Sequence, residues 1–200
     1  MEATTMKKCL AIVLTVILLL SYTAYAKVNH LNYVSSTGEF SFEYPEGYIP
    51  VNSLTVSDVL NVPGVMERFE ALGIGEEMFA LIADNKYEEL FTPEYTGRAS
   101  FTINNTSYMN MGILRMVGRY LLNDIIKNYI ASGVNEDNIE SMGFVVYGPN
   151  TYMGIKVDLK KSHIKQYLTC TNDGTLIYIT FTNYDDLAID LILRTMDFDR

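Results

Sequence analysis

Residues 164–182 read IKQYLTCTNDGTLIYITFT, and this stretch decides the fold that we expect. Apolar and polar residues alternate on both sides of Asn172-Asp173-Gly174, which is typical of half-buried strands. An Asp-Gly pair supplies the positive φ angles that a tight turn needs. Strands over Ile164–Thr171 and Thr175–Thr182 are therefore expected to pair as an antiparallel hairpin.

Two more strands precede this hairpin, over Ile139–Tyr147 and Tyr152–Leu159. The segment between them and the polar turn Lys160–His163 are both short, so neighbouring strands must run antiparallel. The sequence thus predicts one mainly antiparallel sheet built from consecutive hairpins.

A long helix is predicted immediately before these strands, from about Met109 to Ser132. Its apolar residues recur at spacings of three and four, and Gly133 suits the left-handed residue that ends many helices. A second helix is expected to close the chain from about Tyr184, because Asp185 and Asp186 favour the positive end of the helix dipole. Both helices are expected to pack on the sheet, which makes the fold class α+β.

The part of the chain before the long helix has a less regular pattern. Phe40, Phe42 and Tyr44 alternate with polar residues in a predicted strand, and a helical pattern from Ser57 ends at Gly73. Short strands are expected at Met78–Ala83 and Ala99–Ile103. The topology of residues 57–98 stays open.

Residues Met1 to Ala26 contain the three parts of a cleavable secretory signal peptide. The parts are, in order, the basic Lys7-Lys8, the apolar run Cys9–Leu20 and the small-residue site Ala24-Tyr25-Ala26, followed by Lys27. The apolar run is shorter than the roughly 20 residues of a membrane span, and no cysteine lies immediately after the cleavage site to carry a lipid. We therefore expect an exported protein, periplasmic, extracellular or associated with the cell envelope, without a stable membrane anchor after cleavage between Ala26 and Lys27.

Charge and length constrain what the exported part can be. The whole chain has 15 Lys+Arg against 24 Asp+Glu, a net charge of −9; without Lys7, Lys8 and Glu2 the counts become 13 and 23, a net charge of −10. Such an excess of negative charge argues against nucleic acid or an anionic membrane as the main partner. Residues 27–200 suit a single domain. Cys170 is the only cysteine in them, which leaves no internal disulfide and favours a small core residue.

Catalytic and cofactor motifs are not evident in the sequence. A nucleophile needs a neighbouring base, and the histidines, His30 and His163, are predicted in a terminus and a solvated turn. Acidic pairs such as Glu88-Glu89 are common in so acidic a chain, and glycosidase-like chemistry would need two carboxylates facing each other across a cleft. The spacings match neither calcium nor zinc sites, and the glycines form no phosphate-binding loop. We therefore expect no enzyme, no cofactor and no metal.

One face of the predicted sheet is a candidate binding surface. One face of the sheet is predicted to be aliphatic and to receive the long helix. Its residues are Met153, Ile155, Val157, Leu159, Ile177, Ile179 and Phe181. The opposite, amphipathic face would then carry Tyr152, Lys156, Tyr167 and Tyr178. Tyrosine combines a rigid apolar ring with a polar tip, which suits recognition of a protein or a glycan. The alternative is that this face is half solvated or covered by the helix after Ser57.

Charge is also separated along the chain. Residues 67–94 hold eight acidic residues against Arg68 and Lys86, whereas residues 156–165 hold four lysines against Asp158. A partner could be oriented by such poles, although runs of charge usually mark a solvated surface.

Three segments carry a family resemblance. They are the opening Glu39-Phe-Ser-Phe-Glu-Tyr-Pro-Glu-Gly-Tyr48, the strand Tyr178-Ile-Thr-Phe-Thr182 and the closing Leu193-Arg-Thr-Met-Asp-Phe198. In order and spacing these segments resemble the PsbP-like superfamily. The superfamily includes many exported bacterial proteins of unknown role. The resemblance implies an αβα sandwich around an antiparallel sheet and a tendency to bind other proteins. It carries over no catalytic residue, and the acidic segment of residues 67–94 lies outside the pattern.

These observations favour an exported, non-enzymatic binding module that docks a protein partner. Two alternatives stay open: a binder of a small ligand or carbohydrate that uses the tyrosine face, and a hydrolase that uses a carboxylate pair. The identity of the partner and the oligomeric state lie beyond the sequence.

Overall fold

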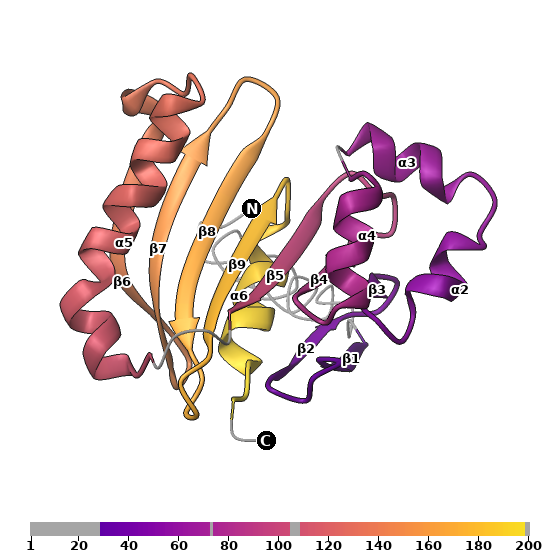
Figure 1. The fold of residues 1–200 in the computed structure, drawn as a ribbon, viewed down its shortest axis with the longest axis horizontal. Helices are drawn as coiled ribbons and strands as arrows, with labels where there is room; N and C mark the ends of the chain where they lie inside the picture. The colour runs from indigo at the N-terminus through magenta and orange to yellow at the C-terminus, as the bar shows by residue number, and fades with distance from the viewer. Residues whose placement is uncertain (1–28, 73, 105–108, 199–200) are drawn as a thin grey trace, which may run out of the picture. The chain divides into compact units, whose positions relative to one another are not determined.

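A seven-stranded antiparallel sheet organises the chain in a computed structural model (Figure 1). The structure describes residues 29–72, 74–104 and 109–198, and the segment Leu31–Arg200 forms one compact unit. The predicted signal peptide lies outside the described residues. Strand order is β3-β4-β5-β9-β8-β7-β6. The strands are β3 (Ile49–Val51), β4 (Tyr87–Phe91), β5 (Arg98–Asn104), β6 (Ile139–Tyr147), β7 (Asn150–Asp158), β8 (His163–Cys170) and β9 (Leu176–Thr182).

The predicted hairpin at the centre of the sheet is confirmed. Cys170 pairs with Leu176, the N–H of Thr171 donates to the carbonyl of Thr175 at 2.9 Å, and Gly174 has a φ of 101°. The hairpin register places Tyr167 beside Ile179 and Leu168 beside Tyr178. This register determines which side chains share a face of the sheet.

Helix α5 (Met111–Ala131) packs on one face of the seven-stranded sheet, which we call the front face; the opposite face is the back face. It covers one half of the front face. The side chain of Asn110 accepts from the N–H of Ile113 at its start, and Gly133, with a φ of 90°, follows its end as predicted. Leu122 packs on Met153, Ile155, Val157 and Leu168 of β7 and β8. None of the described helices combines the length and apolar character that a membrane span requires.

Three short helices cover the other half of the same face: α2 (Val56–Leu60), α3 (Val65–Ala71) and α4 (Glu76–Ala83). The single helix predicted from Ser57 is wrong, because Pro63-Gly64 interrupts it and Gly64 has a φ of 75°. The strand predicted at Met78–Ala83 is also wrong, because these residues form most of α4. Ile82 of α4 packs with Phe69 and Phe91 in an apolar cluster.

Helix α6 (Asp186–Thr195) covers the back face together with β1 (His30–Val34) and β2 (Ser41–Pro45), which pair as a separate two-stranded sheet. Asp185 caps α6 by accepting from the N–H groups of Leu187 and Ala188 at 2.8 and 3.2 Å. Ser41 and Asp197 bond reciprocally, which joins β2 to the end of the chain. The predicted α+β fold, a sandwich with a long helix and a C-terminal helix on an antiparallel sheet, is confirmed.

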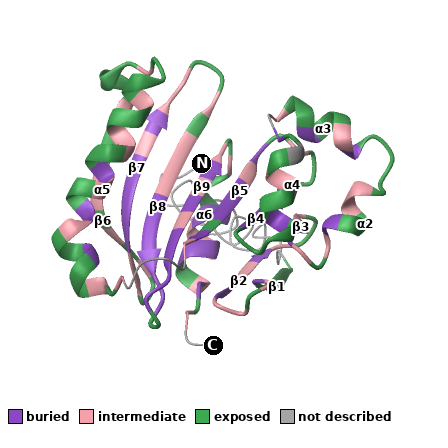
Figure 2. Cartoon of the chain, in the orientation of Figure 1, coloured by how far each residue is buried: buried purple, intermediate pink, exposed green. Residues whose placement is uncertain are grey.

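The core lies mainly between the sheet and the back layer (Figure 2). Its members are aromatic residues of the opening strands, the back-facing residues of the sheet and the apolar face of α6. They include Tyr33, Phe40, Phe42, Phe101, Tyr152, Tyr167, Ile179, Phe181, Ile192 and Leu193. Because Ile177, Ile179 and Phe181 belong to this layer, the prediction that they would face the long helix is wrong.

Gly97 allows β5 to begin against the end of β9, and its replacement tests that packing. A Cβ atom at Gly97 would overlap the carbonyl oxygen of Asn183 and lie 2.9 Å from the carbonyl carbon. We expect Gly97→Ala to lower the free energy of unfolding by about 3 kcal/mol, since backbone must move to relieve the overlap. Urea unfolding followed by circular dichroism would measure it. The control is Gly75→Ala, because a Cβ there meets no atom within 4 Å. Its expected change in the free energy of unfolding is below about 1 kcal/mol. Equal losses of stability in the two variants would contradict the close packing at Gly97.

Candidate functional site

The front face of the sheet is uncovered between α4 and α5, and we call its side chains on β5 and β9 the central strip. The strip consists of three paired positions: Arg98 with Thr182, Ser100 with Thr180 and Thr102 with Tyr178. Thr102 is exposed, Ser100 is buried, and the other four are partly exposed. The strip is therefore a band of hydroxyl groups with one tyrosine and one arginine.

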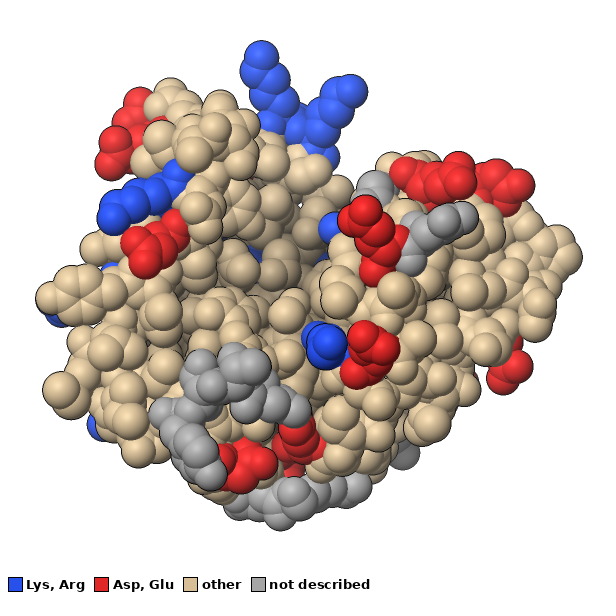
Figure 3. Space-filling model, in the orientation of Figure 1, with Lys and Arg blue, Asp and Glu red and all other residues tan. Residues whose placement is uncertain are grey.

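The change from apolar to polar side chains explains why neither helix covers the strip. On β7 and β8 the front-facing residues are Met153, Ile155 and Leu168, which α5 buries. On β4, Tyr87 and Phe91 are buried with α4. Between these apolar zones the front face carries hydroxyl side chains, which lose little when water remains in contact with them. Figure 3 shows the surface hollowed between α5 and α4.

A hollow of about 410 Å³ lies elsewhere, near Asn150 and Arg194 at the end of α6, whereas a larger one of about 650 Å³ adjoins the central strip. The larger hollow lies where α4 ends, β4 begins and β5 ends. Its lining combines apolar and polar side chains, among them Met78, Leu81, Asp84, Lys86, Tyr87 and Thr102. Lys86 and Asp84 form an exposed ion pair at 3.4 Å. The volume is in the range of small-molecule sites.

Glu89 of β4 borders the central strip from beneath α4 and is only 1% exposed. Its carboxylate accepts from the hydroxyl of Tyr87 and from Ser100 Oγ, which lies 3.0 and 3.1 Å from the two carboxylate oxygens. Arg98 Nη1 lies 3.3 Å from Oε1. Burial raises the pKa of Glu89 to about 7, although Arg98, Tyr87 and Ser100 act in the opposite direction. Ser100 thus joins the strip to a buried ionisable group.

Glu88, the neighbouring residue, points to the back face and is 0% exposed. The hydroxyl of Tyr33 donates to it at 2.6 Å, and the backbone N–H and the hydroxyl of Ser36 donate at 2.7 and 2.6 Å. Asn52 Nδ2 in turn donates to the Tyr33 hydroxyl at 3.1 Å. Successive residues of a strand face opposite sides, so Glu88 and Glu89 cannot act as a pair on one substrate. This pair gives no support to the hydrolase alternative.

The architecture was compared with known proteins. A scan against protein-family models gave no match to the chain, and a search of curated proteins gave none either. Among solved structures, cyanobacterial PsbP (CyanoP) from Synechocystis sp. PCC 6803 is 15% identical, with 87% of this chain and 95% of that chain covered and a TM-score of 0.50. The fold is PsbP-like. The resemblance seen in the sequence is therefore confirmed at the level of the fold.

Two further solved structures are similar over most of the chain. The Ran-binding protein Mog1p of Saccharomyces cerevisiae is 10% identical, with 86% of this chain and 96% of that chain covered and a TM-score of 0.49. A protein of Bacteroides thetaiotaomicron VPI-5482 is 12% identical over 84% of this chain, with a TM-score of 0.42. The present chain spans about half the length of that protein, covering 48% of it.

The PsbP-like fold does not bring the predicted binding residues into one exposed face. Tyr152 and Tyr167 are both 0% exposed on the back face; the Tyr152 hydroxyl donates to the carbonyl of Leu193 at 2.7 Å. Lys156, also on the back side, bonds Asp158 at 2.9 Å and is partly exposed. Tyr178 lies on the front face in the central strip. The amphipathic face predicted from these four residues is therefore wrong, and Tyr178 alone belongs to the candidate site.

The acidic segment of residues 67–94 exposes fewer carboxylates than its sequence suggests, and the basic segment of residues 156–165 lies at the surface. Glu88 and Glu89 are buried, whereas acidic side chains over α3 and α4 are exposed in Figure 3. The β7–β8 turn carries basic side chains at one end of the sheet. His163 beside this turn is exposed, with its Nδ1 2.8 Å from Asp158 Oδ1. Among the described side chains, no three of His, Cys, Asp or Glu gather closely enough to hold a metal ion.

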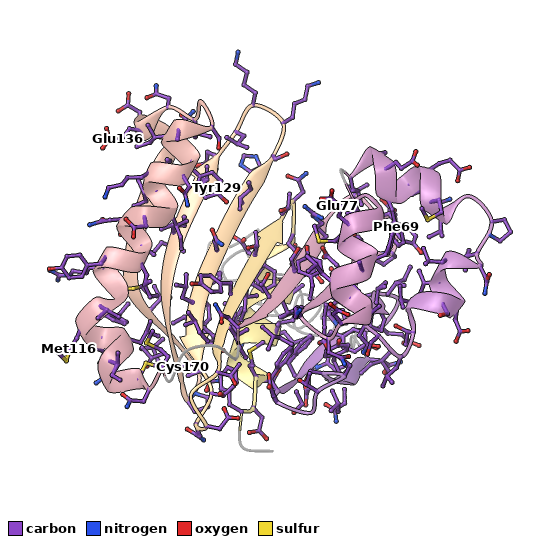
Figure 4. All side chains as sticks on the ribbon, in the orientation of Figure 1. Phe69, Glu77, Met116, Tyr129, Glu136 and Cys170 are labelled. Atoms are coloured by element: carbon purple, nitrogen blue, oxygen red, sulfur yellow. The ribbon has the colours of Figure 1, made fainter. Side chains whose placement is uncertain are left out.

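Cys170 occupies a structural position in the PsbP-like fold. Its thiol is buried in a cluster with Leu114 and Leu176, beneath the beginning of α5 (Figure 4). Burial raises the pKa of this thiol, which keeps it in the less reactive protonated form. The prediction of a small core cysteine is confirmed.

Proposed function

We propose that this chain is an exported, non-enzymatic binding module that docks a protein partner on the central strip. The observation that carries the proposal is the uncovered front face between α4 and α5. A sheet face in a layered domain is normally buried by helices or solvated along its whole extent. Here it is covered on both flanks and open over β5 and β9, which makes a recessed floor between two walls.

The chemistry of the floor and its rim suits a protein ligand. Hydroxyl side chains at Thr102, Thr180 and Thr182 can donate or accept hydrogen bonds. Tyr178 contributes an aromatic plate with a polar tip, a side chain enriched in protein interfaces. Leu81 of α4 is 42% exposed at the rim and supplies apolar area. Export is inferred from the pattern of Met1 to Ala26, and it would place this surface in the envelope or outside the cell.

Site-specific photocrosslinking in the native host tests the proposed surface. A photoreactive amino acid at Thr102 is expected to yield one discrete protein adduct, since this side chain is exposed at the floor. The same amino acid at Leu187, which is 70% exposed on α6, is the matched control on the back of the domain. Thr102→Arg should reduce recovery of the adduct partner about tenfold or more, because a charged, long side chain would fill the floor. Equal adducts from both positions, or none from Thr102, would refute the proposal.

A small ligand or carbohydrate is the second candidate, and the hollow of about 650 Å³ favours it. Its lining offers apolar contact from Met78 and Leu81 and polar groups from Lys86 and Thr102. Nuclear magnetic resonance titration with monosaccharides and aromatic fragments would separate the candidates. A small ligand should shift signals of Met78 and Leu81 and leave Thr182, at the other end of the strip, unchanged. A protein partner should perturb both ends.

A further inference from the structure

The two edges of the main sheet differ in how they are protected against pairing with another strand. β3 has only three residues and includes Pro50, which has no N–H to donate. β6 has nine residues, contains no proline and carries Glu140 as its only charge. Its pairing with β7 is interrupted by a bulge between Ser141 and Gly143. Within the described residues no strand pairs with the outer side of β6. Proteins usually protect a long edge with charges, proline or bulges. The part of β6 after the bulge, residues 144–147, has none of these and is suited to pairing.

The turn after β6 shows which backbone groups face outward. Gly148-Pro149 joins Tyr147 to its partner Asn150, and Gly148 has a φ of 57°. In a hairpin with a two-residue turn the closing pair exchanges both hydrogen bonds, and the pattern alternates along the strand. Tyr147 and Val145 therefore bond to β7. Phe144 and Val146 direct their N–H and C=O groups to the open edge.

The same two residues expose apolar side chains on the front face. Phe144 is 41% exposed and Val146 is 68% exposed. They neighbour each other on one side of the strand, because residues two apart share a face. The outward hydrogen-bonding groups and the exposed apolar area thus coincide in a segment of three residues.

We propose that two copies of this chain associate through antiparallel pairing of their β6 edges, centred on Val145. In this register Phe144 of each copy lies opposite Val146 of the other, and both pairs exchange their outward hydrogen bonds. Aromatic and β-branched side chains form favourable cross-strand pairs. The segment is self-complementary, as a two-fold interface requires.

Charge complementarity at both ends supports a second copy as the occupant. Arg194 of α6 lies against Gly148, where an added Cβ would be 2.7 Å from Arg194 Cγ. Its side chain forms an ion pair with Asp190 one turn earlier and is 56% exposed, so that part of the guanidinium stays accessible. Glu140 is exposed and pairs in register with Lys156 on the back side. Regular pairing centred on Val145 runs from Gly143 to Tyr147, and it brings the bulged end of β6, which carries Glu140, toward Gly148 and Arg194 of the second copy. Residues 141–149 contain no charge, and no like charges meet between these contacts.

Mass measurement in solution tests the pairing. The full chain is produced with its leader, and the form that accumulates is examined by light scattering coupled to size-exclusion chromatography. We expect twice the mass of one chain. Val146→Lys should raise the dissociation constant of the dimer about tenfold or more, because an edge lysine opposes strand pairing, and should leave the circular dichroism unchanged since Val146 is exposed. Leu187→Lys is the matched control on α6 and should leave the dimer intact.

A disulfide trap reports the register. Paired Val145 residues would have Cα atoms about 4.5 Å apart, within the range of a disulfide. Val145→Cys is therefore expected to form a covalent dimer under mild oxidation, whereas Leu187→Cys is not, and buried Cys170 does not compete. A monomer at about 0.1 mM, or a dimer unaffected by Val146→Lys, would overturn the proposal. Because β6 is separate from the central strip, Thr102→Arg should not change the mass, and the two proposals fail independently.

Discussion

Replacing Glu88 with alanine is expected to lower the free energy of unfolding by about 4 kcal/mol. The carboxylate is 0% exposed and accepts three hydrogen bonds, from the Tyr33 hydroxyl and from the N–H and hydroxyl of Ser36. Alanine leaves these donors without their acceptor in a closed site. Each buried donor that loses its partner costs about 1–3 kcal/mol, and the vacated volume adds to the loss.

Urea unfolding of the wild type and of Glu88→Ala measures this change. Glu94→Ala, at an exposed glutamate, is the control. The control is expected to change the free energy by less than about 0.5 kcal/mol. Tyr33→Phe, which removes a single hydroxyl from the same network, should cost about 1 kcal/mol. If Glu88→Ala resembled Glu94→Ala, the opening strands would not be held to the sheet by this carboxylate.

The Glu88 contacts also show why the sequence could not reveal the role of β4. Tyr87-Glu88-Glu89-Leu90 has two adjacent acidic residues, which by themselves indicate exposure. The partners that permit burial of Glu88 lie more than fifty residues earlier, at Tyr33 and Ser36. No local periodicity records a contact of that range, so the sequence left the topology of residues 57–98 open.

Elements with strong local signals were predictable. Asp173-Gly174 determined the β8–β9 turn, and the spacing of Leu114, Leu121 and Ile125 with Gly133 determined α5 and its end. Met78–Ala83 is predicted as a strand but forms a helix, because a short apolar run does not distinguish a strand from a helix buried on one side. Ile82 of this helix packs with Phe69 and Phe91, contacts that the periodicity within the run does not record.

Of the residues in the central strip, the sequence predicts only Tyr178 as a binding residue. Alternation in β7, β8 and β9 indicates that each strand has two faces, but not which faces of neighbouring strands coincide. The register sets Tyr167 beside Ile179 and Thr180 beside Gln166; a shift of one residue would exchange the faces. Alternation alone therefore groups Tyr152 and Tyr167 with Tyr178, although they lie on the opposite side of the sheet. Ser100 and Thr102, which alternate with Phe101 and Ile103, carried the remaining signal for the central strip.

Replacing Glu89 with glutamine is expected to remove a pH dependence of stability between about pH 4.5 and 7. Burial raises the pKa of Glu89 from 4.5 to about 7 in the folded protein. Between these values the folded state therefore holds a proton that the unfolded state has released. The free energy of unfolding should fall as the pH rises through this window, by about 3 kcal/mol from this group, and should be insensitive to Glu89 above it.

Urea unfolding at several pH values from 4.5 to 7.5 measures the slope for the wild type and Glu89→Gln. The histidines and the exposed carboxylates are common to both proteins, so their titration cancels in the difference. Glu77→Gln, on exposed α4 surface, is the control and should keep the wild-type slope. A Glu89→Gln variant with that same slope would mean that Arg98, 3.3 Å from the carboxylate, keeps Glu89 ionised throughout. The buried edge of the central strip would then carry a permanent ion pair, and its partner would meet the same charge at every pH in this range.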